Sequence, residues 1–437
     1  MEVRNKIIAL CTSKVLNRSH VRQENADNGD ISQDDKDSES QQQQDEMEDE
    51  RSRDTADERP ITETFWLFFS LAHFAGLILP ARDKTGSYAL SWKGAVPYIL
   101  SALSCALSFA YVIWVSSADG WDNIRYAINS ESFLTYLFCI KVYTQTARNA
   151  SMMVQQMENA KLLRMKLRWG LSPYFVIVIT FSPLLVSICL TLLYPQLGVL
   201  PNLLPSVVSL LLPMILDVLI GIFVTAIRTS FARLSFALSL ARGRNLGKIH
   251  CLYQQWQKLS EILRTHNELF GSALHLRIWL FVVNIMVNAY ILISLKMYGG
   301  KCLVLATFTA LPLAETVLYF FVISSLGEML RREDIHLLQV LLRETYQEAA
   351  GSPEQLALSN FCSRVCARKA ELRDEGADSD VSARTFVTKL SLATTTLAIL
   401  LQLNPEGMAE APNSSSFGTY DICFSKAHNS TSGFDFF

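Results

Sequence analysis

The chain is poor in charge, which already narrows the class of protein. Lys, Arg, Asp and Glu make up 18% of its 437 residues, whereas half of the residues are hydrophobic. A typical soluble protein carries about 25% charged residues. The 39 Lys and Arg residues nearly balance the 41 Asp and Glu residues, so no basic excess predicts a nucleic-acid partner. The composition therefore predicts a membrane protein.

The sequence also lacks the short motifs that mark common catalytic and metal sites. It contains no His-Glu-x-x-His, Gly-x-Ser-x-Gly or P-loop pattern, and its seven His residues are dispersed. The nine Cys residues form no Cys-x-x-Cys pair and no Cys/His group at metal-ligand spacing. We therefore expect no enzyme activity, no metal ion and no cofactor.

The first part of the chain has too few hydrophobic residues to form a folded core. Residues 1–60 are an acidic, Gln-rich tract, which cannot bury enough apolar surface to offset the entropy of ordering. The short apolar patch that follows Met1 is too short for the hydrophobic part of a signal peptide. We expect a disordered tail that stays in the cytosol.

Seven hydrophobic stretches then follow, each near the length that crosses a hydrocarbon core of about 30 Å. They cover residues 95–116, 131–147, 172–194, 203–227, 276–297, 302–324 and 385–403. These stretches predict an all-α membrane domain over residues 61–403 with seven transmembrane helices. The segment 61–80 is apolar too, but it carries Glu63 and His73. We expect it to lie at the interface or to re-enter the membrane, with a true span as the alternative.

The positions of Lys and Arg indicate how the helices are oriented. Twenty-one Lys and Arg residues lie in or beside one set of alternate loops and four in the opposite set. Positive charge is retained on the cytosolic side, so the N-terminus is expected in the cytosol and the C-terminus outside the cell. The tail 404–437 carries glycosylation sequons at Asn413 and Asn429, which agrees with an extracellular location.

Two long cytosolic loops carry a helical pattern. In residues 228–275 and 325–384, apolar residues recur three and four positions apart. This spacing predicts amphipathic helices that continue out of the membrane. We expect them to pack on each other, with binding to the membrane surface as the alternative.

Three ionisable residues fall well inside predicted spans, more than five residues from either end, where such groups normally face a bundle interior or a water-filled cavity. They are Lys141, Asp217 and Glu315. Asp217 follows Pro213 by one turn and is a candidate for ligand binding or gating. The alternative is a structural ion pair, for which Lys141 is a candidate partner. Glu315 is more typical of a structural contact.

Uncharged polar residues mark two further spans. Asn284 and Asn288 share one face of the fifth span and are candidate ligand-binding residues, although hydrogen bonds between helices also explain them. The last span carries Ser391, residues 394–396 and Gln402 on an otherwise apolar helix. Such a polar stripe is typical of a pore-lining segment, and close packing of small residues is the alternative.

The end of the last span carries a pattern that bears on the family. Residues 395–403 read Thr-Thr-Leu-Ala-Ile-Leu-Leu-Gln-Leu. With the Ala-Gly-Leu-Ile-Leu-Pro segment before the first span and the long helical cytosolic loops, this arrangement resembles the insect gustatory receptor family of seven-helix chemoreceptors. That family has Thr-Tyr, five hydrophobic residues and Gln-Phe in its last helix. Thr395 and Gln402 match this signature, whereas Thr396 and Leu403 replace the Tyr and Phe.

The resemblance implies a ligand-gated, non-selective cation channel of the plasma membrane, opened by a small extracellular tastant. It implies a homotetramer or a heterotetramer with related subunits, surrounded by membrane lipid. The last helices of four subunits would surround one pore, lined or gated by Thr395, Thr396, Ile399, Gln402 and Leu403. Gln402 would lie near the extracellular end, and Leu403 could form a hydrophobic constriction.

Two other functions remain as alternatives. A seven-helix receptor coupled to a G protein needs an extracellular N-terminus, and the loop charges indicate the reverse. A secondary transporter would use Asp217 and Glu315 as coupling-ion sites and would be expected to carry an internal repeat. No such repeat is visible in the sequence.

Overall fold

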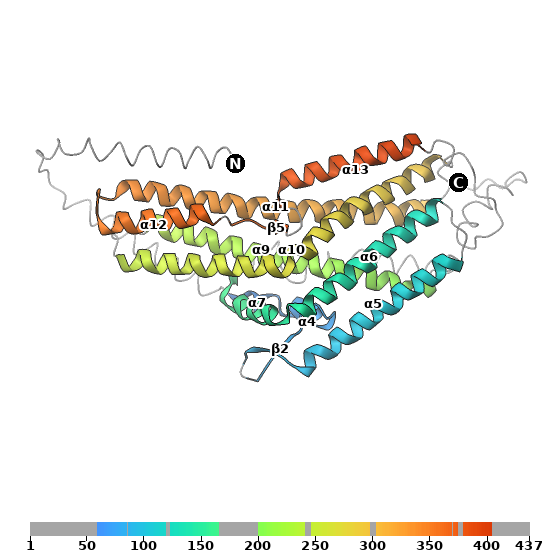
Figure 1. The fold of residues 1–437 in the computed structure, drawn as a ribbon, viewed down its shortest axis with the longest axis horizontal. Coiled ribbons are helices and arrows are strands. Elements are labelled where there is room, and N and C mark those ends of the chain that lie inside the picture. The colour runs from blue at the N-terminus through green and yellow to red at the C-terminus, as the bar shows by residue number, and fades with distance from the viewer. Residues whose placement is uncertain are drawn as a thin grey trace, which may run out of the picture.

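The protein is an elongated bundle of helices (Figure 1). The computed structural model describes residues 59–84, 86–118, 123–165, 200–240, 246–297, 303–368, 370–374 and 379–403. The predicted tail, the third predicted span at 172–194 and both extracellular sequons lie outside the described residues, apart from two residues at the end of the tail.

Three helices of unusual length form the centre of the bundle. They are α9 (Leu200–Leu240), α10 (Leu246–Met297) and α11 (Leu303–Gln347). At 1.5 Å per residue their paths measure about 60, 78 and 68 Å. Each is therefore about twice as long as the thickness of a hydrocarbon core, so each continues well beyond one membrane crossing.

Four more helices complete the main bundle. They are α5 (Trp92–Ala118), α6 (Asn123–Arg148), α12 (Pro353–Ala367) and α13 (Ala383–Leu403). The start of α12 follows from its sequence, because the Ser352 side chain accepts a hydrogen bond from the Gln355 backbone N–H at 3.1 Å. Pro353 occupies the first helical position, where its missing N–H costs nothing.

Hydropathy and length qualify four of the described helices as membrane spans. The qualifying stretches are Trp92–Tyr111 of α5, Leu211–Ser239 of α9, Leu246–Ile293 of α10 and Ala383–Gln402 of α13. Within the described ranges, α6 and α11 are long enough but do not qualify. The chain is thus a mostly helical, multi-pass membrane protein, while the count of seven spans stays a prediction.

The apolar segment 61–80 is too short in its helical part to cross a membrane. It forms α3 (Ile61–Thr64) and α4 (Trp66–Phe74), and α4 is about 14 Å long. The chain then turns at Gly76, whose φ is +73°, and a Cβ at this position would lie 2.8 Å from the Tyr98 Cα. Only glycine fits this turn without strain.

Short antiparallel pairings fix the connections. The paired strands are β1 (Arg59–Pro60) with β4 (Arg164–Met165), β2 (Pro80–Arg82) with β3 (Tyr88–Leu90), and β5 (Arg373–Asp374) with β6 (Ser379–Asp380). The β2–β3 hairpin packs on α7 (Ala150–Leu162), where Lys161 contacts both Glu158 and the Gly86 carbonyl.

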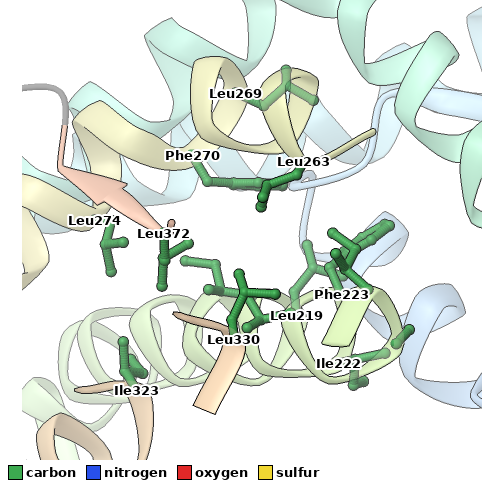
Figure 2. Packing of buried hydrophobic residues seen from close by; sticks show 14 of the residues in the cluster. Leu219, Ile222, Phe223, Leu263, Leu269, Phe270, Leu274, Ile323, Leu330 and Leu372 are labelled. Atoms are coloured by element: carbon green, nitrogen blue, oxygen red, sulfur yellow. The ribbon is translucent and has the colours of Figure 1, made fainter. Parts of the chain in front are cut away.

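The hydrophobic core runs between the three long helices (Figure 2). Its labelled members come from α9, α10, α11 and the segment before β5; they are Leu219, Ile222, Phe223, Leu263, Leu269, Phe270, Leu274, Ile323, Leu330 and Leu372. The same core continues from the membrane-length part of α9 into the extensions of α10 and α11, so the two parts are one packed body.

Candidate functional site

The most buried charge in a predicted span belongs to an ion pair. The side chain of Asp217, in the middle of α9, is 0% exposed, and that of Arg277, on α10, is 8% exposed. Arg277 donates from Nη2 to Oδ2 at 2.6 Å, and from Nε to Oδ2 at 3.0 Å and to Oδ1 at 3.1 Å. Both carboxylate oxygens are therefore engaged by one guanidinium group.

This geometry supports the structural alternative for Asp217, with a different partner from the one considered. Lys141 is exposed on α6, whereas Arg277 lies directly opposite the carboxylate. Sequence reasoning missed Arg277 because it lies at the edge of the predicted fifth span, where positive charge is ordinary. Glu315 lies within α11, but its side chain is outside the described part of the structure.

Aromatic rings complete the surroundings of the ion pair. The guanidinium carbon of Arg277 lies 4.2 Å from the ring centroid of Phe281 and 5.9 Å from that of Phe138. A cation over an aromatic face in a desolvated site gains about 2 kcal/mol. The rings and the carboxylate together compensate for the removal of Arg277 from water. Because Asp217 lies on α9, Phe281 on α10 and Phe138 on α6, these three helices meet at this point.

The two predicted ligand-binding Asn residues lie on the same face of α10 as Arg277. Positions 277, 284 and 288 differ by seven and four residues, which places them in one row along the helix. Asn288 is buried and donates from Nδ2 to the Asn284 backbone carbonyl at 2.8 Å, and Asn284 Oδ1 is buried. The bond between them lies within one helix, so α10 presents a polar row to the bundle interior.

The predicted pore residues separate into two groups on α13. Thr395 and Gln402, with Ser391, share one exposed face, because their spacings of four and seven residues return to the same side of a helix. Ile399 is also exposed. Thr396 is half-buried on a side turned about 100° from Thr395. Leu403 is the last residue of α13, and its side chain is outside the described part.

The last helix differs from the others in how little protein covers it. Only 6% of its apolar stretch is buried, compared with 72% for α9. It packs against α10 and α11 on one side. The opposite side carries the polar stripe, which Thr388 extends by one position that sequence reasoning did not single out. Its spacing from Ser391, three residues, was the signal that could have identified it.

A glycine on α11 allows the segment just before α13 to pack closely against α11. A Cβ on Gly327 of α11 would lie 1.9 Å from the Val381 carbonyl oxygen and 3.0 Å from its carbonyl carbon. The Val381 backbone N–H donates to the Leu372 carbonyl at 2.8 Å, which closes the β5–β6 connection. The start of α13 is therefore seated directly on the backbone of α11.

Comparisons with known proteins identify the fold. No family model matches the sequence, and no curated protein matches it. Among solved structures, the chain is similar to the insect olfactory receptor OR5 from Machilis hrabei, with a TM-score of 0.59 and 12% identity over 78% of this chain and 100% of that chain. The same receptor in complex with eugenol matches with a TM-score of 0.63 and 10% identity, over 79% and 99% of the two chains. The chain therefore shares the fold of this insect olfactory receptor.

Proposed function

We propose that the chain is a chemosensory receptor, a ligand-gated non-selective cation channel opened by a small extracellular tastant. The observation that carries the proposal is the likeness of fold to an olfactory receptor over almost the whole length of that receptor. The polar face of α13 adds support, because a conduction path requires polar groups on a helix that crosses the membrane.

The exposed helix α13 argues for assembly. Polar side chains that face hydrocarbon lose their hydrogen bonds to water, which is costly, so Thr395 and Gln402 are best satisfied beside a water-filled path. The described part of a single chain encloses no such path around α13, since this helix lies at the edge of the bundle (Figure 1). Four copies with α13 turned inward would enclose one, as a homotetramer or with related subunits, in the plasma membrane.

The polar row of α10 is the part of the bundle that we propose for ligand contact. Asn284 and Asn288 lie on the face that points into the bundle, on the side of Arg277 toward the end of the span predicted to be extracellular. The Machilis hrabei receptor was solved with eugenol, so eugenol is a suitable first probe beside sugars, bitter compounds and amino acids. A tastant opens the channel if it binds the open state more tightly than the closed state.

The test is ligand-evoked current from cells that express the full chain alone, with surface expression confirmed by glycan attached to Asn413 and Asn429. Gln402→Ala should change single-channel conductance or relative cation permeability by about twofold or more, because the amide would lie on the conduction path. Leu400→Ala is the matched control, since residue 400 lies about 200° around the helix from residue 402.

Equal conductance in wild type, Gln402→Ala and Leu400→Ala channels would contradict the assignment of α13 as the pore helix. Uptake of a solute that depends on a coupling ion, without channel openings, would instead support the transporter alternative. That alternative uses Asp217 as a coupling-ion site, and the engagement of both its carboxylate oxygens by Arg277 counts against it.

A further inference from the structure

The helix α13 has two side-chain attachments near its start that connect it to the rest of the bundle. Phe386 lies one turn into α13, and its ring centroid is 5.0 Å from that of Phe320 and 5.7 Å from that of Phe321, both on α11. One turn later, Lys389 places its Nζ 3.8 Å from the ring centroid of Trp279 on α10. Both contacts lie in the first two turns of α13, so they attach the beginning of this helix to α11 and α10.

The Phe386 contact continues into the bundle through buried rings. Phe320 stacks on Phe281 of α10, with centroids 5.3 Å apart and planes 22° apart. Both rings are 0% exposed. Phe281 in turn lies beneath the Arg277 guanidinium at 4.2 Å, and Arg277 is held by Asp217 of α9. A continuous row of side chains thus joins α9, α10, α11 and α13.

Each contact in this row has a preferred geometry, unlike contacts between flexible aliphatic chains. The ion pair is held by three short N–O contacts, and planar guanidinium and ring faces stack only over a narrow range of positions. Close-packed interiors have few voids, so such groups move between discrete arrangements and do not deform gradually. A shift of α9 against α10 therefore has to move the rings that follow.

We propose that Asp217, Arg277, Phe281, Phe320 and Phe386 form a positioning row that sets the placement of α13 according to the arrangement of α9 and α10. The proposal rests on the proposed channel function, because it assigns to the row the connection between a ligand-sensing bundle and the pore helix. The residues of the row are positioning residues, since none of them lies on the polar face of α13. Arg277 occupies the centre of the row, because it contacts both the carboxylate and the first ring.

The row can be tested by the chemical accessibility of α13, a readout that needs neither ligand nor current. Ser391→Cys places a thiol on the exposed face of α13, and its reaction rate with a positively charged, water-soluble thiol reagent is measured on the full chain in membrane vesicles. The same chain with Ser391 intact gives the background of the native Cys residues. Arg277→Lys keeps the charge but removes the forked donors, and Phe386→Leu keeps an apolar side chain but removes the ring.

We expect each single substitution to change the rate at residue 391 by about fivefold, the effect of a coupling near 1 kcal/mol. The double variant Arg277→Lys with Phe386→Leu should change this reaction rate by no more than the larger of the two single effects, because Arg277 acts on α13 through Phe386. Asp217→Glu serves as a second perturbation of the ion pair and should behave like Arg277→Lys. Phe109→Leu is the control, because its ring pairs with Phe133 between α5 and α6, and it should leave the rate within about twofold.

Two results would overturn the positioning row. One is a double variant whose change in reaction rate equals the product of the two single changes. The other is an unchanged reaction rate in both Arg277→Lys and Asp217→Glu. If the chain conducts in response to a ligand but the two single changes in reaction rate multiply in the double variant, the channel function stands and the positioning row is wrong. If the chain never conducts but the double variant changes the reaction rate no more than the larger single effect, the positioning row stands and the channel function is wrong.

Discussion

Two helices that both qualify as membrane spans, α9 and α13, have opposite surroundings. In α9, 72% of the apolar stretch is buried, and its one carboxylate is paired inside the bundle. In α13, 6% is buried, and its Thr and Gln side chains lie on the open face. A polar group in the covered helix thus serves packing between helices, whereas polar groups on the uncovered helix face something outside the chain. Burial therefore separates polar residues that pack inside the bundle from polar residues that are accessible on its surface, which hydropathy does not.

The largest effect on this contrast between the two helices is expected from removing one partner of the buried ion pair between Asp217 and Arg277. Asp217→Ala leaves a buried guanidinium without a carboxylate, and we expect it to destabilise the protein by about 3–5 kcal/mol. Thermal unfolding of detergent-purified protein measures the effect. The double replacement Asp217→Leu with Arg277→Met should recover much of the loss, because apolar side chains of similar size avoid the cost of dehydrating two charges. A double variant as unstable as Asp217→Ala would contradict this account.

A smaller effect is expected where the backbone before α13 rests on α11. Gly327→Ala forces a methyl group against the Val381 carbonyl and should cost about 1–3 kcal/mol through overpacking. The matched control is Gly221→Ala in α9, where the new Cβ would meet only the Leu326 Cδ1 at 3.6 Å. Because alanine is the better helix former, that change should be neutral or slightly stabilising. Equal melting temperatures for the two variants would show that the close approach is not maintained.

The smallest effect is expected at an exposed ion pair that contrasts with the buried one. Lys161 donates to Glu158 and, with the Tyr88 backbone N–H, lowers the pKa of the Glu158 carboxyl. A lowered pKa in the folded state adds stability that is present above the unfolded pKa and is lost as the pH falls through the folded pKa. Because the Glu158 side chain is 40% exposed, solvent screening limits this contribution to about 0.2–1 kcal/mol.

Glu158→Gln tests this contribution by comparing melting temperatures at pH 7 and pH 4. The variant should be slightly less stable than wild type at pH 7, and the difference should shrink toward pH 4. A difference that grows as the pH falls would mean that the carboxyl is stabilised in its protonated form, against the contacts described above.

The sequence predicted those parts of the fold that depend on local pattern. Hydropathy located both ends of α5 and α13 and the start of α9 within a few residues, because each has an apolar stretch long enough for a membrane. The end of α9 lies at Leu240, well beyond the predicted end at residue 227. The three-and-four spacing predicted helices in the loops 228–275 and 325–384. The described residues of these loops are helical over 228–240, 246–275, 325–347 and 353–367, whereas the end of the second loop forms the short pairing of β5 with β6. The membrane side on which these extensions lie remains a prediction from the positions of Lys and Arg.

The parts that sequence reasoning missed depend on which elements meet. Arg277 carried no signal of its own, since only the approach of α9 to α10 makes it the partner of Asp217. Thr396 was grouped with Thr395 as a neighbour in sequence, although adjacent residues point about 100° apart on a helix. The Gly327 contact was equally invisible, because the Val381 carbonyl that needs the space lies more than fifty residues further along the chain.

The length of α11 has a mechanical consequence. This helix runs along the long axis of the molecule for about 68 Å, and it packs against α9, α10, α12 and α13 (Figure 1). A rod of this length that tilts by about 3° around one end carries its far end through about 3–4 Å, more than half a helical turn. Small angular changes where the outer bundle packs thus become lever-arm displacements at the opposite tip, where α12 is attached.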